Sequence, residues 1–282
     1  MLALRQTMVW TLFAGALVLS AAGPACAQGK LEARYTVTLA GIPIGSGNWT
    51  VDINDTQYSA SASGTTTGLM KAFTGGQGTS AARGTFNGGK LLTSIYASTI
   101  STRKKNDTVR LSIANGNVKE FAVDPPPDDD PERVPVTDAH RQGIVDPMTS
   151  SMLRVPGTGS PLVPEACQHS ISVFDGRLRY DLQLAYKRLE QVKADKGYAG
   201  PAVVCAVYFS PVAGFIPSRS AIKYITKQRD IEVWLAPIAG TRVLVPFRAQ
   251  GPTPVGHVVM EADQFVTAAA PARATANGAK TQ

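Results

Sequence analysis

The chain has 282 residues, of which 44% are hydrophobic and 17% charged, and its formal net charge is +7. The only run of three basic residues is Arg103-Lys104-Lys105, and the other positive charges are scattered. Because no basic helix is predicted, the charge does not indicate a nucleic-acid-binding protein. A solvated outer face of a sheet explains the excess, and contact with an anionic membrane surface is the alternative.

Residues 1–27 have the pattern of a secretory signal peptide. Arg5 supplies the positive charge, residues 8–20 form an apolar run of 13 residues, and Ala25-Cys26-Ala27 is a small-x-small cleavage site. The apolar run is shorter than the roughly 20 residues of a membrane-spanning helix. We therefore expect cleavage after Ala27, export to the periplasm, and a mature chain that begins at Gln28.

Two cysteines remain after this cleavage, Cys167 and Cys205. In an oxidising compartment such a pair predicts a disulfide, with two buried free thiols as the alternative. No CxxC or HxxxH spacing accompanies them, so neither a metal site nor another cofactor is expected. The bond would close a loop of about 39 residues and contribute about 4 kcal/mol in the chain-entropy model.

The first half of the mature chain reads as successive strands. Tyr35, Val37 and Leu39 alternate with polar residues, as in a strand with one buried face. Strand-like runs follow at 48–53, 57–67, 79–86, 91–101, 107–114 and 117–123. Turns are expected at 41–45, 54–55, 87–89 and 115–116. Strands of even length joined by short turns predict an antiparallel meander.

The pattern changes at residues 124–138, which form a loop rich in Pro and Asp. Its carboxylates lack the spacing and the glycine of a calcium loop. Asp146-Pro147 then predicts the start of a short helix over 148–155, with Asp146 as the N-cap. We expect this helix to cover an open end of the sheet.

A hairpin over 172–186 is the clearest element of the second half. Asp175-Gly176 predicts a two-residue turn. After it, the apolar face carries Leu178, Tyr180, Leu182, Leu184 and Tyr186. A polar turn region at 193–200 and strands at 203–209, 221–228, 231–236, 241–249 and 257–266 follow. Pro246 predicts an edge or a bulge in its strand.

These patterns predict an all-β protein: one large antiparallel sheet, strongly curved or forming an open barrel, with one short helix. The domain is expected to span 28–267. The tail at 268–282 is rich in Ala, Pro, Thr and Lys and is expected to be disordered.

The motifs, taken together, resemble the exported bacterial proteins of domain-of-unknown-function family 3108. The matching pieces are 35–45, Gly68-Leu-Met-Lys71, the predicted helix after Asp146, Cys167 with Phe174-Asp-Gly-Arg-Leu-Arg-Tyr180, Cys205, Ile231-Glu-Val-Trp-Leu-Ala236 and Val245-Pro-Phe-Arg248. The resemblance covers nearly all of 31–266, and a local departure is expected at 125–131. It implies a periplasmic antiparallel β protein and carries over no catalytic residues.

The sequence shows no catalytic constellation. Its three histidines are His140, His169 and His257, and it has neither a GxSxG elbow nor an HExxH motif. His169 is expected to be hydrogen-bonded at a strand end, and His257 to be exposed. A hydrolase is therefore the least favoured of three functional hypotheses, and we expect no enzymatic activity.

The first hypothesis is a monomeric carrier of a lipid or another apolar envelope molecule, held by the concave face of the sheet. The expected lining is Tyr180, Leu182, Leu184, Tyr186, Val212, Phe215, Ile216, Val233, Leu235 and Val245. The same residues could instead fill a solid core. The second hypothesis is a structural or assembly factor of the cell envelope that acts through protein contacts near Pro246 and the acidic loop.

Overall fold

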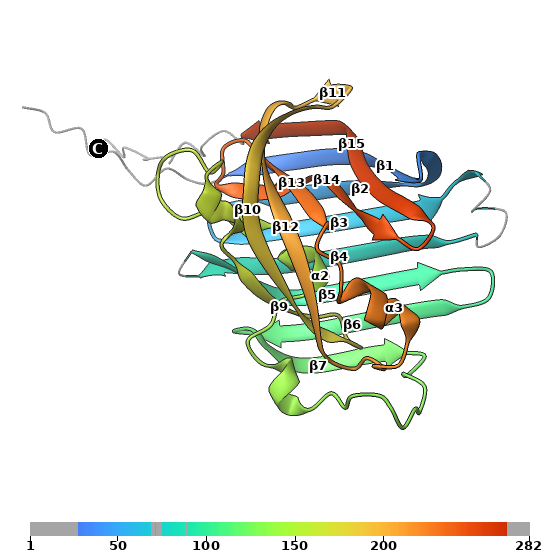
Figure 1. Cartoon of the computed structure of the whole chain (residues 1–282). Helices are drawn as coiled ribbons and strands as arrows, with labels where there is room; N and C mark the ends of the chain where they lie inside the picture. Colours follow the sequence, from blue (N-terminus) through green and yellow to red (C-terminus); the bar gives the residue numbers. More distant parts are fainter. Residues whose placement is uncertain (1–27, 69–70, 72–74, 88, 270–282) are drawn as a thin grey trace, which may run out of the picture.

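The computed structural model describes residues 28–68, 71, 75–87 and 89–269 (Figure 1). The predicted signal peptide lies outside the described residues, as do Leu69 and Met70 of the family-like segment 68–71. Of the predicted tail, only Ala268 and Ala269 are described, and they belong to the last strand.

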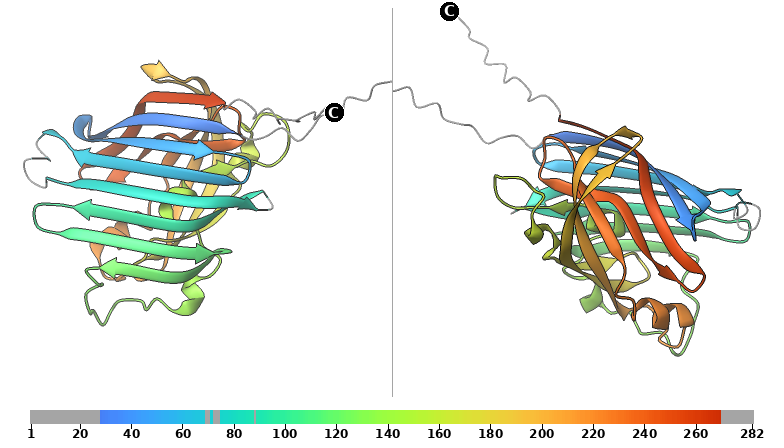
Figure 2. Two further views of the ribbon diagram at one scale, coloured as in Figure 1. Left: turned by 180° about the vertical axis from the view of Figure 1, so that it is seen from behind. Right: turned by 45° about the horizontal axis from the view of Figure 1, so that its top comes forward.

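The first half of the chain is the expected antiparallel meander. Its strands are β1 (Gly29–Leu39), β2 (Ile42–Ile53), β3 (Gln57–Thr66), β4 (Gln77–Asn87), β5 (Lys90–Ser101), β6 (Asn106–Ala114) and β7 (Asn117–Asp124). On β1, Leu31, Ala33 and Tyr35 are buried while the residues between them are exposed. This alternation gives the meander one face in the core and one in solvent. Figure 2 (left) shows the meander from its solvent side, with its antiparallel strands side by side in one broad sheet.

The turns of the meander agree with the sequence in one case and differ in another. Asn115 and Gly116 have φ values of 51° and 75° and join β6 to β7, as predicted. The turn expected at 41–45 instead falls at Ala40 and Gly41, with φ values of 48° and 80°. Because Gly41 supplies the positive φ, the chain reverses before Ile42, and 42–45 belong to β2.

The second half contains the remaining strands and the short helices. In chain order these are η1 (Asp138–Arg141), α2 (Pro147–Ser150), β8 (Leu153–Arg154), η2 (Pro164–Cys167), β9 (Ser170–Phe174), β10 (Arg179–Lys193), β11 (Lys196–Gly197), β12 (Ala199–Ala213), α3 (Ser220–Ile225), β13 (Glu232–Pro237), β14 (Val243–Thr253) and β15 (Gly256–Ala269). The elements η1 and η2 are single turns of 3₁₀-helix.

All described strands belong to one sheet, whose main path is β7-β6-β5-β4-β3-β2-β1-β15-β14-β13-β12-β10-β9. The main-path pairings are antiparallel, and only β11 runs parallel to its partner β15. Because β15 pairs with β1, the second half of the chain continues the sheet from the first strand of the meander. The predicted fold class is therefore confirmed.

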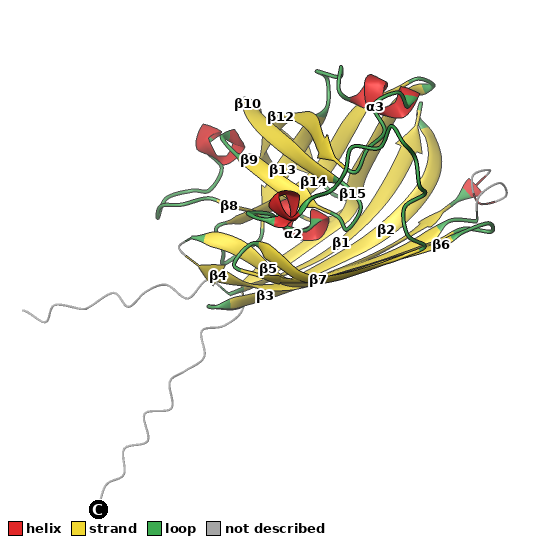
Figure 3. Ribbon diagram, turned by 90° about the horizontal axis from the view of Figure 1, so that it is seen from below, coloured by secondary structure: helices red, strands yellow, loops and turns green. Residues whose placement is uncertain are grey.

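The sheet curls until its two end strands approach each other, but in the described part of the chain β7 and β9 do not pair with each other. Figure 3 shows β9, β10 and β12 facing the meander across an interior that contains α2. The rings of Phe121 on β7 and Phe174 on β9 are 6.4 Å apart, edge to face. Arg177, in the loop after β9, forms an ion pair of 3.1 Å with Asp107 on β6. Side chains thus link the two ends of the curl.

Pro246 marks a bulge in β14, as predicted. The register with β13 shifts between Trp234 and Leu235, so that Leu235 pairs with Pro246 and Phe247 is left as the extra residue. The Pro246 carbonyl accepts a hydrogen bond of 2.7 Å from the hydroxyl of Tyr35. A bulge of this kind bends a strand, and here β14 changes its neighbour from β8 to β15 along its length.

Several local predictions for the second half were wrong. The turn after β9 spans four residues, because the Asp175 carboxylate accepts hydrogen bonds from the amides of Arg177 and Leu178 at 2.8 and 2.7 Å. The expected strand at 221–228 is helix α3, so the chain has more than one short helix. The polar turn at 193–200 contains β11, which pairs with β15. Helix α2 is shorter than the expected 148–155, since β8 begins at Leu153.

Two apolar clusters stabilise this arrangement. The main core gathers the inner face of the meander with Met148, Phe174 and Phe247. The second core includes Val203 and Cys205 of β12, while their neighbours Ala202 and Val204 belong to the main core. Alternation on one strand therefore supplies both cores. Residues from β8 to η2 cover the second core.

Candidate functional site

The disulfide predicted from the sequence is confirmed. Cys167 at the end of η2 is bonded to Cys205 in the middle of β12, with their Cα atoms 5.5 Å apart. Both residues are fully buried in the second core. The bond therefore ties the covering segment to the sheet, and its burial indicates a structural role.

The residues predicted to line a ligand site occupy three environments. Leu184 and Leu235 are buried in the second core, and Val233 packs against it. Val245 is fully buried in the main core, and Ile216 is also buried. The half-buried members are Tyr180, Leu182, Val212 and Phe215, and Tyr186 is 39% exposed. That these residues line a ligand site stays a prediction. The half-buried residues are the members that a ligand could contact.

The inner face of the meander becomes more exposed to solvent towards one end. Three successive cross-strand rows show this gradient on β3, β4 and β5. In the first row Ala60, Ala82 and Tyr96 are buried, at 4%, 1% and 6% exposed. In the second row Ala62, Ser80 and Ser98 are half-buried. In the third row Gly64, Gly78 and Ile100 stand side by side, and Ile100 is 54% exposed.

We call the last two rows the open inner face, made of Ala62, Ser80, Ser98, Gly64, Gly78 and Ile100, with Gly47 on β2 paired to Gly64. Gly47, Gly64 and Gly78 lie next to one another on three neighbouring strands. Without side chains there, the backbone itself forms a shallow floor that a bound molecule could approach closely.

An aromatic pair stands on the strands that face this surface. The rings of Tyr180 on β10 and Phe209 on β12 are 5.2 Å apart, and both residues are half-buried. Burial raises the pKa of Tyr180, and the nearby Asp175, Tyr96 and Asp146 raise this pKa further. Since Tyr96 belongs to the inner face of β5, Tyr180 lies near that face. Its hydroxyl stays neutral at physiological pH, so the aromatic pair adds no charge to the surface that faces the meander.

A buried polar network closes the opposite end of the interior. The Asp146 carboxylate accepts hydrogen bonds from the amides of Met148 and Thr149 at 2.8 and 3.1 Å, as an N-cap does. It also accepts hydrogen bonds from the hydroxyls of Thr93 and Thr149, the first at 2.6 Å. Tyr58 bonds to Thr149 at 2.7 Å. The sequence indicated the cap, but not Thr93, which lies 53 residues away.

Burial raises the pKa of Asp146, and its hydrogen bonds from Thr149, Thr93 and Met148 only partly oppose this. Asp146 and Thr149 are almost completely buried, at 0% and 2% exposed. The network joins α2 to β3 and β5 and offers no route for a substrate. Its arrangement fits a structural role, as a polar contact that fixes α2 inside the curl.

The histidines lie apart from these features. His257 is exposed, as predicted, and the Nδ1 atom of His140 accepts a hydrogen bond of 3.1 Å from the amide of Thr137. His169 departs from expectation, because its Nε2 atom is buried with no hydrogen-bond partner among the described residues, and burial lowers its pKa. In the described ranges, no three His, Cys, Asp or Glu side chains gather as a metal ion would need.

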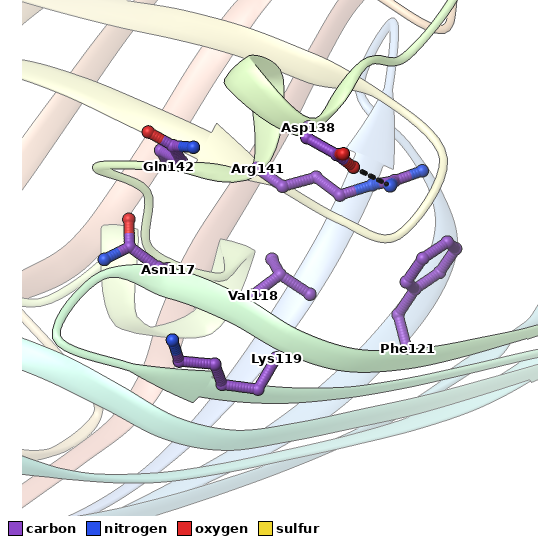
Figure 4. Close-up of a pocket in the computed structure, with 7 residues that line it drawn as sticks. All are labelled: Asn117, Val118, Lys119, Phe121, Asp138, Arg141 and Gln142. Atoms are coloured by element: carbon purple, nitrogen blue, oxygen red, sulfur yellow. Dashed lines mark hydrogen bonds and ion pairs between the residues drawn. The ribbon is translucent and has the colours of Figure 1, made fainter.

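A separate hollow of about 440 Å³ lies at the edge of the sheet, between β7 and η1 (Figure 4). Its walls are Asn117, Val118, Lys119, Phe121, Asp138, Arg141 and Gln142. The Arg141 guanidinium lies over the Phe121 ring, 4.4 Å from its centroid, and pairs with Asp138 at 2.9 Å. No pattern in the sequence predicts this hollow, because its residues come from a strand and a 3₁₀ turn separated by the Pro/Asp loop.

Comparisons with known proteins identify the family to which the chain belongs. No curated protein matches the chain. A crystal structure titled as a β-barrel-like protein of domain of unknown function DUF1849 from Brucella abortus resembles it with a TM-score of 0.43 and 8% sequence identity, over 86% of this chain and 98% of that one. A similarity of this size carries no argument about function. In the described part of the chain, no helix is both long enough and apolar enough to span a bilayer.

The family model described as a protein of unknown function, DUF3108, matches residues 34–263, which include the disulfide, the open inner face and the edge hollow. The chain therefore belongs to the DUF3108 family, as its motifs indicated.

Proposed function

We propose that the protein is exported to the periplasm and binds a lipid or another apolar envelope molecule against the open inner face, without catalysing a reaction. The observation that carries this proposal is the gradient of burial along the inner face. One end is a filled core, and the other leaves Ile100 and Gly64 exposed, with Gly47 and Gly78 half-buried beside them. Inward-facing apolar residues of a curled sheet are normally covered, so their exposure favours a removable occupant.

The chemistry of this surface favours an apolar occupant. Its only polar side chains are Ser80 and Ser98, and these bond to each other at 3.1 Å. Tyr180 and Phe209 add two aromatic rings, and the Tyr180 hydroxyl is uncharged. Covering such a surface contributes about 25 cal/mol for each Å² of apolar area removed from water. A flexible acyl chain fits a shallow floor of glycine backbone better than a bulky rigid ligand does.

Export is supported by the disulfide between Cys167 and Cys205, because such bonds persist in oxidising compartments. The predicted signal peptide agrees with this location. The alternative, an envelope assembly factor that acts through protein contacts, is favoured by one observation, the exposed edge strand β7.

The test is ligand binding with a matched pair of substitutions on β3. Gly64→Trp places a ring on the open inner face, where a Cβ atom would meet only the Ser46 carbonyl, at the ordinary contact distance of 3.5 Å. Ser63→Trp places the same ring on the opposite, solvent-exposed face. Titration with a fluorescent fatty acid should show binding to the natural protein and to Ser63→Trp. We expect Gly64→Trp to bind about tenfold more weakly or not at all.

Mass spectrometry of lipid extracts from protein purified out of the periplasm should also find a molecule that co-purifies with it. Absence of any apolar molecule, together with no fatty-acid binding, would contradict the proposal. Equal loss of binding in both variants would indicate a general disturbance of the sheet and would also count against it.

A further inference from the structure

Strand β7 leaves one edge of the sheet free. Over the described residues it pairs only with β6, and its residues 119–122 are all exposed. An edge strand carries alternating backbone N–H and C=O groups without protein partners, which another extended chain can pair with. With eight residues, β7 is long enough for such pairing.

The segment that follows β7 covers only the beginning of this edge. The amide of Ile144 donates to the carbonyl of Gly116 at 2.9 Å, and the amide of Gly143 donates to the side chain of Asn117 at 3.4 Å. These contacts place η1 beside the start of β7. Beyond them lies the hollow of about 440 Å³, which opens along the strand (Figure 4).

A register shift makes Lys119 part of this hollow. Glu120 pairs with Ser112 and Val118 pairs with Ile113, so Lys119 is the extra residue of a bulge. Bulges at sheet edges re-aim side chains. Figure 4 shows Lys119 and Arg141 on opposite sides of the hollow, with Phe121 at one end and the Asn117 amide at the other.

Arg141 has hydrogen-bonding capacity that the described chain does not use. Its Nε atom is buried and has no hydrogen-bond partner among the described residues. Among the described residues it forms one ion pair, with Asp138, whose side chain is 93% exposed, and a pair with such an exposed partner is weak. The guanidinium is nevertheless held in place by the Phe121 ring beneath it. Because Nε is buried, a carboxylate would reach the Nη atoms of this fixed guanidinium, of which Nη1 already bonds to Asp138.

The combination of an open strand edge, two cations and an aromatic ring specifies the occupant. A lipid chain would find too little apolar surface beside these charges. Nucleic acid would need a wider basic surface than these two cations provide. An extended peptide satisfies every feature: its backbone pairs with β7, and a carboxylate side chain reaches Lys119 and Arg141.

We propose that β7 binds an extended acidic segment of another protein by strand addition, with an Asp or Glu side chain of that segment held between Lys119 and Arg141. This site lies on the edge of the sheet and is independent of the open inner face. The molecule would thus recognise a protein partner and an apolar ligand at separate places.

The experiment selects a partner sequence and then tests the pairing. Random heptapeptides displayed on phage are selected on the natural protein and on the double variant Lys119→Gln/Arg141→Gln. Peptides enriched only on the natural protein should carry Asp or Glu between strand-forming residues. The best peptide is then measured by fluorescence anisotropy. We expect the double variant to bind it about tenfold or more weakly.

Two controls separate strand addition from simple charge attraction. Arg110→Gln removes a charge on β6, next to Ala122, and should leave the affinity unchanged. N-methylation of every second peptide residue removes the N–H groups along one edge of the peptide. Of the two possible series, odd or even residues, the one that blocks the edge facing β7 should lose binding, and the other should retain it. Hydrogen exchange should show protection at β7 amides when the peptide is bound.

Three results would overturn the proposal. They are no enrichment of acidic peptides, equal binding by both methylated series, or self-association of the natural protein through β7 that peptide does not displace. The last result would assign the edge to a second copy of the chain.

Discussion

Replacing Asp146 by Ala tests how α2 is held inside the curl. The substitution removes the N-cap of α2, which contributes about 1 kcal/mol. It also removes the nearer of two acceptors of the buried Thr93 hydroxyl, the carboxylate at 2.6 Å, and leaves Thr149 at 3.1 Å as the other. Losing this hydrogen bond to a carboxylate costs about 1.5–3 kcal/mol. Thr149 keeps Tyr58 as a partner, so it adds no separate cost. The free energy of unfolding should therefore fall by about 2–4 kcal/mol.

Urea unfolding followed by tryptophan fluorescence measures this change, because Trp49 and Trp234 are buried. The matched control is Asp138→Ala, an aspartate at another short helix whose side chain is 93% exposed, and we expect a change below about 0.5 kcal/mol. In a double-mutant cycle with Thr93→Val, the effects of the two substitutions should be non-additive. Equal effects of Asp146→Ala and Asp138→Ala would refute the reasoning.

Three further predictions follow from buried features. Cys167→Ser, which opens a loop with a sequence separation of 38, should lower the free energy of unfolding by about 4 kcal/mol in the chain-entropy model, as measured in urea. Gly176→Ala should cost more than about 1 kcal/mol, because φ is 98° and a Cβ atom would lie 2.5 Å from Val109, whereas Gly159→Ala meets nothing within 4 Å and should have little effect. Because burial raises the pKa of Asp146, the folded state holds this proton more tightly than the unfolded state. This residue's contribution to stability should therefore fall as pH rises above about 4, and urea midpoints of Asp146→Asn should lack that slope.

The sequence was sufficient for the fold class because antiparallel strands carry a local signal. Alternation at Tyr35, the Asn115-Gly116 turn and the Asp146-Pro147 helix start each depend on near neighbours in the chain, and each was confirmed. Errors arose where a contact with a distant element decided the local structure. The strand β11 exists because it pairs with β15, far along the chain.

The candidate site was harder to predict for the same reason. Apolar alternation on β10 showed which residues share a strand face, but not what covers that face. Leu184 is covered by the segment tied to Cys205, whereas Tyr180, on the same face of β10, packs against Phe209. The open inner face depends on Gly64 and its neighbours coming into register, and register is a property of the whole sheet.

The most direct test of the central claim is to locate a bound apolar molecule on the protein. A fatty acid with a photoreactive group near its methyl end is bound, irradiated and mapped by peptide mass spectrometry. Our account predicts cross-links at Ile100 or Ser98 on the open inner face, or at Tyr180 or Phe209 on the facing strands. Cross-links confined to the solvent face of the meander, for instance at Ser63 or Thr79, would contradict it.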